Sequence, residues 1–246
     1  SNGNAIYVEA GDVRLLFDAG ISGRALEERL RALGRGISQV QALVISHDHS
    51  DHVRALGIYQ RRFGLPVHVT ANTLCAATER CRLGRLGAIR HFQAGQTIDF
   101  GRVTVETVPT PHDGADGVAF VVDDGERRLG ILTDLGHVFR GLDEVTRSLD
   151  AVVIESNYDP VMLAGGPYPE SLKRRIRGRG GHLSNVEAAH LLGVCGVGRL
   201  RWACLAHLSE ENNRPELALR THREILGDRL TLHVASRYGP IGPLEV

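Results

Sequence analysis

Short apolar runs separated by polar turns dominate this chain, and they predict strands that alternate with helices. The runs Ala5–Glu9 and Val13–Phe17 are joined by a short polar turn, so they predict a hairpin. Between Ser22 and Gly34, leucines recur at helical spacing among arginines and glutamates, which predicts an amphipathic helix. The N-terminal part of the chain is therefore expected to combine both kinds of element.

The rest of the chain continues this pattern and indicates the fold class. Further strands are predicted at 42–45, 67–70, 96–99, 102–108, 117–123, 128–133, 151–155, 201–206 and 230–235, with helices at 51–63 (Ser50 as N-cap), 72–82, 140–148, 185–193 and 214–226. A run of strands followed by alternating strands and helices occurs twice. Two such halves predict an α/β protein, a four-layer αββα sandwich of two mixed β-sheets flanked by helices. The linker-like stretch 164–169 is too short to separate domains, so residues 1–246 are expected to form a single domain.

Composition excludes several classes of protein. Hydrophobic residues make up 42% and charged residues 24% of the chain, as in an ordinary globular protein. No apolar run approaches the roughly 20 residues that cross a bilayer, and no signal peptide opens the sequence, so we expect a cytoplasmic protein without a membrane partner. The formal net charge of +0 argues against a uniformly positive surface. The cysteines form no CxxC pair and are expected to be reduced and structural.

The hexapeptide His47–His52, directly after a predicted buried strand, is the densest group of metal-ligand residue types in the chain. Imidazole and carboxylate groups are ligands that zinc and manganese select. His47 and His49 are two residues apart, so an extended backbone points both side chains the same way. Asp51 and His52 follow where a helix is expected to begin, and this change of direction lets them face a second metal.

Three further residues of ligand type follow apolar strands at other places in the chain. His112 comes after 103–108, Asp134 after 129–133 and His207 after 202–206. The carboxyl ends of strands are the usual place of sites on α/β sheets, so these residues are expected to converge with the hexapeptide. Asp134 is the natural bridging group, because a carboxylate has two oxygens with which to hold two cations together.

These residues, in this order, resemble the metallo-β-lactamase superfamily: His-x-His-x-Asp-His, a later His, a later Asp and a last His. The segment Phe17-Asp18-Ala19-Gly20 is similar to the strand-ending Asp-x-Gly of that family. The resemblance implies the metallo-β-lactamase fold and two divalent metal ions, zinc or manganese. It also implies that Asp18 accepts a hydrogen bond that orients a ligand imidazole.

The resemblance further implies a division of the ligands between the two metals. His47, His49 and His112 would hold one ion. Asp51, His52 and His207 would hold the other ion, and Asp134 would lie between the two ions. Asp48 is expected to be a helper or solvent-facing residue and not a ligand.

Four other segments resemble the WalJ/YycJ branch of this superfamily, cytoplasmic bacterial proteins associated with DNA exonuclease activity. These segments are 155–159, 166–169, 181–185 and 205–213. The resemblance implies a phosphodiesterase, most specifically a DNA exonuclease that uses a hydroxide bridging two metals. Metal ions lower the pKa of bound water toward about 7, and the net positive charge of such a site favours an anionic substrate.

His182 is the main catalytic candidate besides the metal ligands Asp51 and Asp134. It lies in a glycine-rich turn just before a helix that a capping box of Ser184 and Glu187 begins. The free amides of such a helix start favour a phosphate oxygen, so His182 and Ser184 are candidate substrate contacts. A protonated imidazole could also donate a proton to the leaving group.

A basic run lies just before this turn and is the candidate contact with DNA. Lys173, Arg174 and Arg175 begin this run and could bind backbone phosphates independently of sequence, although such a run is also typical of a solvated helix face. Asn157, in a segment that resembles the WalJ/YycJ branch, is a further candidate for substrate binding. Aromatic residues make up only 5% of the chain, which disfavours an extended base-stacking platform.

Three alternatives stay open from the sequence. The first is a hydrolase of small phosphodiesters, esters or lactams that does not act on DNA. The second is a di-iron redox protein on the same scaffold, which His49 disfavours because flavo-di-iron proteins have a carboxylate at that place. The third is a binding module with an inactive site, which the intact set of ligand positions disfavours.

Overall fold

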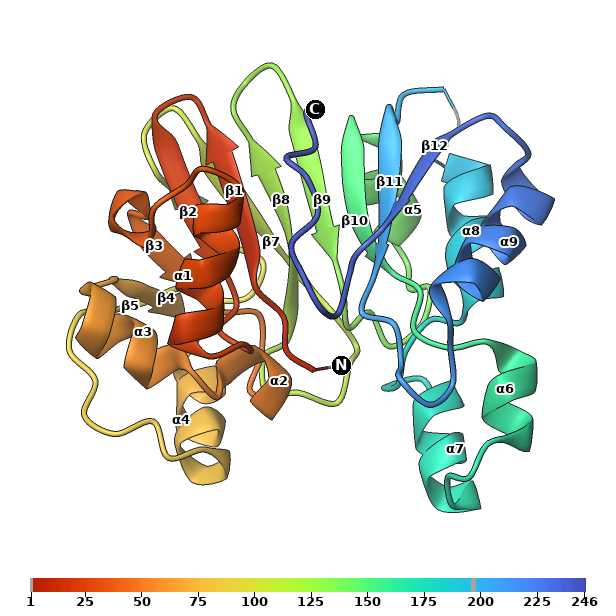
Figure 1. Ribbon diagram of the computed structural model, residues 1–246, viewed down its shortest axis with the longest axis horizontal. Helices are drawn as coiled ribbons and strands as arrows, with labels where there is room; N and C mark the ends of the chain where they lie inside the picture. The colour runs from red at the N-terminus through yellow and green to blue at the C-terminus, as the bar shows by residue number, and fades with distance from the viewer. Residues whose placement is uncertain (1, 196–197) are drawn as a thin grey trace. The chain divides into compact units, whose positions relative to one another are not determined.

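The computed structural model describes residues 2–195 and 198–246 of the chain. These residues form two compact units. Unit 1 comprises Ser1–Pro109, Gly114–Val118 and Arg237–Glu245, and unit 2 comprises Thr110–Asp113 and Ala119–Ser236, with Val246. Both units combine strands with helices (Figure 1), as the sequence predicts. The expectation of a single domain stays a prediction.

Unit 1 contains a mixed five-stranded sheet in the order β1-β2-β3-β4-β5. Its strands are β1 (Ile6–Ala10), β2 (Val13–Phe17), β3 (Ala42–Val44), β4 (Val67–Val69) and β5 (Ile89–His91). The β1–β2 hairpin is antiparallel and the other neighbours are parallel. A second antiparallel hairpin follows, made of β6 (Thr97–Asp99) and β7 (Thr104–Pro109). The predicted strands are confirmed, whereas β5 was not predicted because this strand is only three residues long and mostly exposed.

The helices of unit 1 bury their apolar faces against this sheet. They are α1 (Gly23–Ala32), α2 (Ser50–Val53), α3 (Leu56–Phe63) and α4 (Ala71–Arg80), with a short 3-10 helix at Ile37–Gln39. In α1, Leu26 and Leu30 are buried in the core and Ser22 caps the helix by accepting a hydrogen bond from the Ala25 amide. Fully burying one such leucine stabilises the fold by about 1.5–3 kcal/mol.

One predicted helix of unit 1 is wrong in two respects. The range 51–63 contains two helices, because the amide of Ala55 donates to the Ala19 carbonyl and the first helix stops before it. The residue at the N-cap of α2 is His49, whose side chain makes no capping bond, and Ser50 is the first helical residue. The role of this short helix is to present the second half of the hexapeptide.

Unit 2 contains strands in the order β12-β11-β10-β9-β8. They are β8 (Val118–Asp123, in this unit from Ala119), β9 (Arg128–Leu132), β10 (Ala151–Glu155), β11 (Trp202–Ala206) and β12 (Thr231–Val234). β8 and β9 are antiparallel, and the other pairs are parallel. Both β10 and β11 lie in the interior of this sheet, and four of five β10 residues and all five β11 residues are buried, which is typical of a parallel sheet.

The helices of unit 2 include two that the sequence pattern did not predict. The predicted helices are α5 (Leu142–Arg147), α8 (Asn185–Cys195) and α9 (Pro215–Leu226), and α8 packs against both α5 and α9. The others are α6 (Pro160–Gly165) and α7 (Glu170–Arg177). They flank the linker-like stretch of glycine and proline, where helical periodicity is too short to recognise. Figure 1 shows α6 and α7 extending away from the strands of unit 2.

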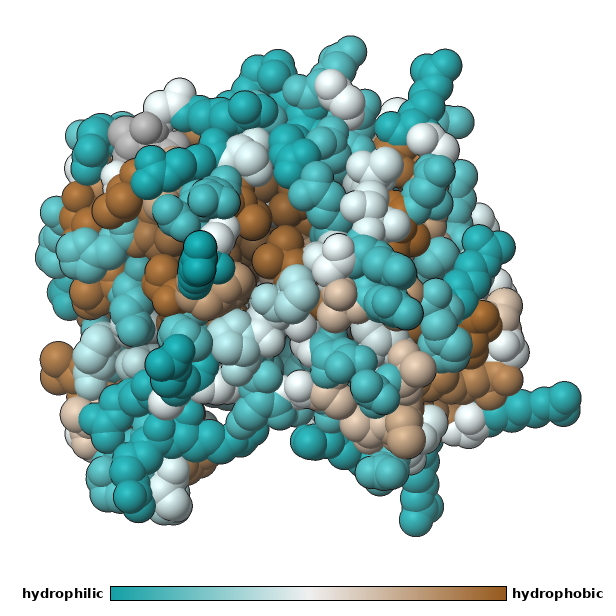
Figure 2. All heavy atoms as spheres, turned by 180° about the vertical axis from the view of Figure 1, so that it is seen from behind, coloured by the Kyte–Doolittle hydropathy of each residue, from teal (hydrophilic) through white to brown (hydrophobic). Residues whose placement is uncertain are grey.

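The surface carries both apolar and polar side chains. On the face shown in Figure 2, brown apolar areas are broken by teal hydrophilic ones. Among the described residues, none of the helices combines the length and the apolar character that crossing a bilayer requires.

His222 on α9 makes the stability of the fold depend on pH. Its side chain is fully buried, its Nδ1 donates to the Ala218 carbonyl at 2.8 Å, and burial lowers its pKa from 6.5 to about 4. Between these two values the unfolded chain binds a proton that the folded chain does not, so stability falls as the pH is lowered.

We therefore expect His222→Gln to lose less stability than the natural chain between pH 7 and pH 4.5. The expected difference is about 2–3 kcal/mol, measured as the free energy of unfolding in denaturant at both pH values. His190→Gln is the matched control, because His190 lies exposed on α8. An equal pH dependence in all three proteins would contradict this role of His222.

Candidate functional site

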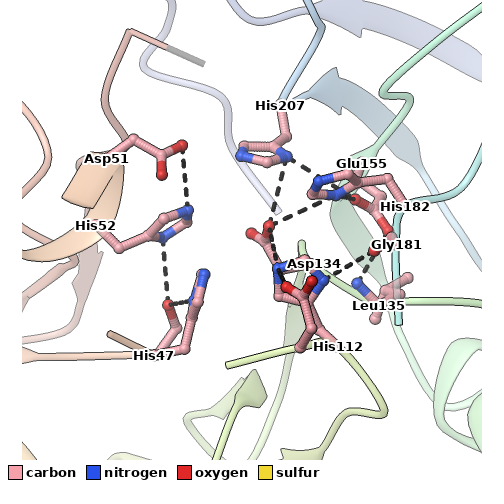
Figure 3. Close-up of polar contacts among 12 residues, drawn as sticks. His47, Asp51, His52, His112, Asp134, Leu135, Glu155, Gly181, His182 and His207 are labelled. Carbon is pink, nitrogen blue, oxygen red and sulfur yellow. Dashed lines mark hydrogen bonds and ion pairs between the residues drawn. The ribbon is translucent and has the colours of Figure 1, made fainter. Parts of the chain in front are cut away.

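The hexapeptide follows β3 in unit 1 and gathers its imidazole rings. The ring centroid of His47 lies 4.6 Å from that of His49 and 4.1 Å from that of His52. The carboxylate of Asp51 lies 3.7 Å from Nε2 of His52. The extended backbone at His47 and His49 and the short turn of α2 thus bring these four residues of ligand type together, as Figure 3 shows for His47, Asp51 and His52.

Asp18 fixes the orientation of one of these rings. It lies just after β2 with a φ of 64°, in the left-handed region that non-glycine residues rarely adopt. Its Oδ1 accepts a hydrogen bond from the Ser46 amide at 2.8 Å, and its Oδ2 lies 2.7 Å from Nδ1 of His52. Because Nδ1 is engaged in this way, the opposite ring nitrogen, Nε2, is the one suited to a metal.

Asp48 was expected to be a helper or a solvent-facing residue, and its burial shows that the second alternative is wrong. Its Oδ1 accepts a hydrogen bond from the Ala115 amide at 2.7 Å, and its Oδ2 pairs with Nε of Arg80 at 2.6 Å. A side chain at Gly114 would come within 3.0 Å of the His47 ring. Asp48 therefore holds the hexapeptide against the segment that begins at Gly114.

A second group of ligand-type residues lies in unit 2. Asp134, Glu155, His182 and His207 each offer one atom, and these atoms lie within 4.8 Å of one another. Nε2 of His112 is 3.5 Å from Oδ1 of Asp134 (Figure 3). Asp134 and Glu155 are both buried, and two neighbouring buried carboxylates are costly unless cations compensate them. The donor set thus favours a bound cation.

Backbone strain accompanies this group. Asp134 and His207 have φ values of 56° and 54°, and together with Asp18 they are three of the four non-glycine residues with positive φ among the described residues. Such conformations cost about 1–3 kcal/mol each and persist where the surrounding structure enforces them, often at functional sites. The strain points to the two groups as the functional part of the molecule.

Glu155, at the end of β10, is a member of this group that the site prediction missed. Its Oε1 accepts hydrogen bonds from the amides of Leu135 (2.9 Å) and Leu183 (3.1 Å), and its Oε2 lies 3.1 Å from Nδ1 of His182. Burial alone would raise the pKa of Glu155, but the neighbouring imidazoles of His182 and His207, at 3.1 and 3.8 Å from its Oε2, outweigh burial and lower the pKa to about 2. The available signal was its place as the last residue of a buried strand, whereas the criterion that identifies Asp134 selects residues just past a strand end.

His182 is the member of this group with access to solvent. Its side chain is 20% exposed, against 5% for Asp134 and 3% for His207. It precedes α8, whose capping box forms as predicted: the Glu187 amide donates to Ser184 Oγ at 3.2 Å, and the Glu187 carboxylate accepts from the Ser184 amide at 2.8 Å. Of these residues, His182 is thus the one best placed to touch a substrate.

Three of the other residues predicted to bind substrate are engaged within unit 2. The Ser184 hydroxyl donates to Glu187, and Asn157 Nδ2 donates to the His207 carbonyl at 2.8 Å. Lys173 is buried, and its Nζ donates to the Ala164 carbonyl at 2.8 Å. These contacts count against Lys173 as a phosphate-binding residue and make Asn157 a residue that positions His207.

Two arginines of the predicted basic run, Arg174 and Arg175, both on α7, are exposed to solvent. Arg175 makes two bonds to the carboxylate of Asp113, Nε–Oδ2 at 2.6 Å and Nη2–Oδ1 at 3.0 Å. Arg175 is therefore occupied beside His112, whereas Arg174 is available to a ligand.

The ligand-type residues of both units fit divalent metal ions. Each group combines imidazole nitrogens with carboxylate oxygens, the donors that zinc and manganese accept. The ring nitrogens also have outer contacts: Nδ1 of His47 lies 3.0 Å from the Ser46 hydroxyl, and Nδ1 of His112 lies 2.8 Å from the Gly181 carbonyl. Such contacts are the usual support of metal-binding imidazoles.

Comparisons with known proteins agree with this chemistry. The family model of the metallo-beta-lactamase superfamily matches residues 1–165. Exodeoxyribonuclease YycJ of Bacillus anthracis is 34% identical over 93% of this chain and 87% of its own length. Exodeoxyribonuclease WalJ of Streptococcus pneumoniae is 32% identical over 90% of this chain and 83% of its own length.

Solved structures share the fold at low sequence identity. The metallo-beta-lactamase fold protein YhfI of Bacillus subtilis has a TM-score of 0.72 at 18% identity, covering 95% of this chain and 89% of that one. A diphosphatase from the PhnP family has a TM-score of 0.69 at 14% identity, covering 100% of this chain and 85% of that one. At such identities the likeness concerns the fold alone.

Proposed function

The chain belongs to the metallo-β-lactamase superfamily, and from this premise we propose that it is a dinuclear metal-dependent exonuclease that degrades DNA. Membership makes the chain a metal-dependent hydrolase and confirms the expected α/β fold, with two mixed sheets flanked by helices. The count of metal ions, the DNA substrate and the roles of individual residues are the parts that we propose.

We assign the ligands by the order of the motifs along the chain. His47, His49 and His112 would hold one ion. Asp51, His52 and His207 would hold the other, and Asp134 would contribute a further carboxylate. The contacts of each residue within its own unit support the assignment, because the imidazoles are oriented by outer hydrogen bonds and the carboxylates are held close to them.

The likeness to two exodeoxyribonucleases over nearly the whole chain carries the choice of DNA as the substrate. Relatives at this level of identity, matched over more than four-fifths of their own length, make the same reaction class the most economical proposal. A ribonuclease Z of Bradyrhizobium diazoefficiens is also similar, at 30% identity, but over only 52% of this chain and 46% of its own. RNA is accordingly the alternative substrate that the experiment must address.

The residues of unit 2 account for the movement of protons. Divalent ions, when bound, supply the charge that activates water and stabilises the phosphoryl oxygens. A proton on Nδ1 of His182 would be donated to the ionised carboxylate of Glu155, which leaves Nε2, the other ring nitrogen, for the substrate. When the phosphorus–oxygen bond breaks, Nε2 can donate a proton to the leaving sugar oxygen while the incoming water oxygen bonds to phosphorus; that water releases one proton to the solvent, and Nε2 takes up a proton from the solvent before the next cycle. Glu155 stabilises the charged imidazole and keeps its ring oriented.

The test is to give the purified, zinc- or manganese-loaded protein end-labelled duplex DNA, single-stranded DNA, RNA and bis-(p-nitrophenyl) phosphate. We expect progressive shortening of DNA from an end, complete loss of activity with a chelator, and recovery when metal is restored. Gel analysis of the labelled products distinguishes shortening from internal cleavage.

Three results would contradict the proposal in different ways. Cleavage of the small diester with DNA intact at low salt would indicate a small-molecule phosphodiesterase. Preferential degradation of RNA would indicate a ribonuclease. Internal cuts in DNA without shortening would retain the nuclease and remove the exonuclease assignment.

A further inference from the structure

The helices α6 and α7 form an arm of unit 2 whose outer face is strongly cationic. We call residues 159–179 the α6–α7 arm. It leaves the sheet after β10 and ends directly before the turn that carries His182, and Figure 1 shows both helices beyond the ends of the strands. The chain thus departs from the site and comes back to it through this arm.

Internal contacts give the arm a defined shape. Asp159 caps α6 by accepting hydrogen bonds from the amides of Val161 (3.0 Å) and Met162 (2.9 Å). Lys173, the sole lysine of the sequence, turns inward from α7 and donates to the Ala164 carbonyl of α6. This bond joins the two helices, so the arm can present a fixed surface.

The arginines of the arm are exposed whereas its lysine is buried, and one of them, Arg179, also places Nη2 3.3 Å from Nε2 of His137. Arg174, Arg177 and Arg179 are exposed. Arg177 lies 3.8 Å from the exposed carboxylate of Glu170, a pair of little energetic weight in water. Within residues 2–195 and 198–246, the structure shows no carboxylate paired with Arg174 or Arg179. In a chain with a formal net charge of +0, this is a local concentration of positive charge, and the arm is largely teal at the lower left of Figure 2.

The end of the arm is fastened beside the candidate site of unit 2. Arg175 donates two hydrogen bonds to the carboxylate of Asp113, and Asp113 directly follows His112 in the sequence. The Asp113 amide donates to the Gly180 carbonyl at 3.1 Å, and Nδ1 of His112 lies 2.8 Å from the Gly181 carbonyl. The cationic face therefore begins next to His112 and His182 and leads away from them.

We propose that the outer face of the α6–α7 arm, formed by Arg174, Arg177 and Arg179, binds the backbone phosphates of the nucleic acid strand that extends away from the scissile bond. This inference rests on the proposed function and deepens it by naming the surface that holds the polymer. Arg174 and Arg177 lie one turn apart on α7, about 4.5 Å along its axis, which is similar to the roughly 3.4 Å of axial rise between neighbouring phosphates of a strand. Guanidinium groups suit phosphate because they offer several donors in a planar fork.

The test uses the metal-loaded triple variant R174Q/R177Q/R179Q. Binding of a fluorescent 30-nucleotide strand is followed by anisotropy at several salt concentrations, and turnover is measured on the same strand and on bis-(p-nitrophenyl) phosphate. We expect DNA binding about tenfold weaker at low salt and a slope of log affinity against log salt reduced by about 2–3. Turnover of the small diester stays unchanged, because it is too short to reach the arm.

The matched control is R140Q/R220Q/R223Q, which removes the same charge from exposed arginines elsewhere in unit 2. If the natural protein degrades DNA and the two triple variants behave alike, the arm proposal is wrong while the nuclease stands. If the arm variant alone loses DNA binding but the natural protein cleaves only the small diester, the arm is a DNA-binding surface and the exonuclease proposal is wrong. If the natural protein neither binds nor degrades DNA, both proposals fail.

Discussion

Replacing His182 with asparagine lowers kcat on DNA by about 10²–10⁴ while the bound metal is retained. The reason is that His182 is the accessible residue of its group and its Nδ1 is held by the buried, ionised Glu155. Removing the imidazole removes the proton donor to the leaving sugar oxygen. Asparagine keeps a polar side chain in the turn before α8, so the capping box at Ser184 is left in place.

A comparison of leaving groups separates a proton donor from a residue that only maintains structure. p-Nitrophenolate departs without needing a proton, so we expect His182→Asn to impair bis-(p-nitrophenyl) phosphate much less than DNA. Glu155→Gln should follow the same pattern, more weakly. His190→Asn on the exposed face of α8 is the matched control and should leave both rates unchanged. An equal loss on both substrates, or a loss of metal, would contradict the assignment of His182 as the acid.

Replacing Asp134 with asparagine lowers turnover on every substrate by at least about 10³-fold. A metal site contributes several kcal/mol to transition-state stabilisation, and about 4 kcal/mol corresponds to this factor. Asparagine is the informative choice, because Asp134 has a φ of 56° and asparagine tolerates the left-handed region. The backbone is kept, and only the charge and one ligand oxygen are removed.

Asp116 provides the control for this substitution. It is exposed and has a φ of 47°, but it belongs to neither group of ligand-type residues. Asp116→Asn should retain full kcat. The free energy of unfolding of both variants, measured in denaturant, should equal that of the natural chain to within about 1 kcal/mol. Normal turnover of Asp134→Asn on DNA would show that this carboxylate is no part of the catalytic machinery.

The sequence allowed most strands and the ligand-type residues to be predicted because both follow from simple periodicity and strand ends. β10 and β11 are short, apolar and buried, and the residues just beyond such strands gather at one edge of a sheet. Asp134 and His207 were found by this rule. Glu155 is the last residue of its strand and does not lie beyond it, so this rule does not select Glu155.

Other features could not be read from local sequence, because tertiary contacts decide them. The position of α6 decides which basic side chain of α7 is buried. The spacing of residues along α7 alone cannot predict this, because it does not show where α6 lies. Lys173 is buried for this reason while Arg174 stays exposed. Asp48 likewise looked like an exposed acid, and the amide of Ala115, distant in sequence, is what holds it inside.

The most direct test of the account is the metal content of the natural protein, measured by elemental analysis after loading with zinc or manganese and removal of excess ions. We expect two ions per chain, fewer than two in Asp134→Asn, and both in Asp116→Asn. A natural protein that degrades DNA at full rate with one ion or none per chain would contradict the dinuclear centre.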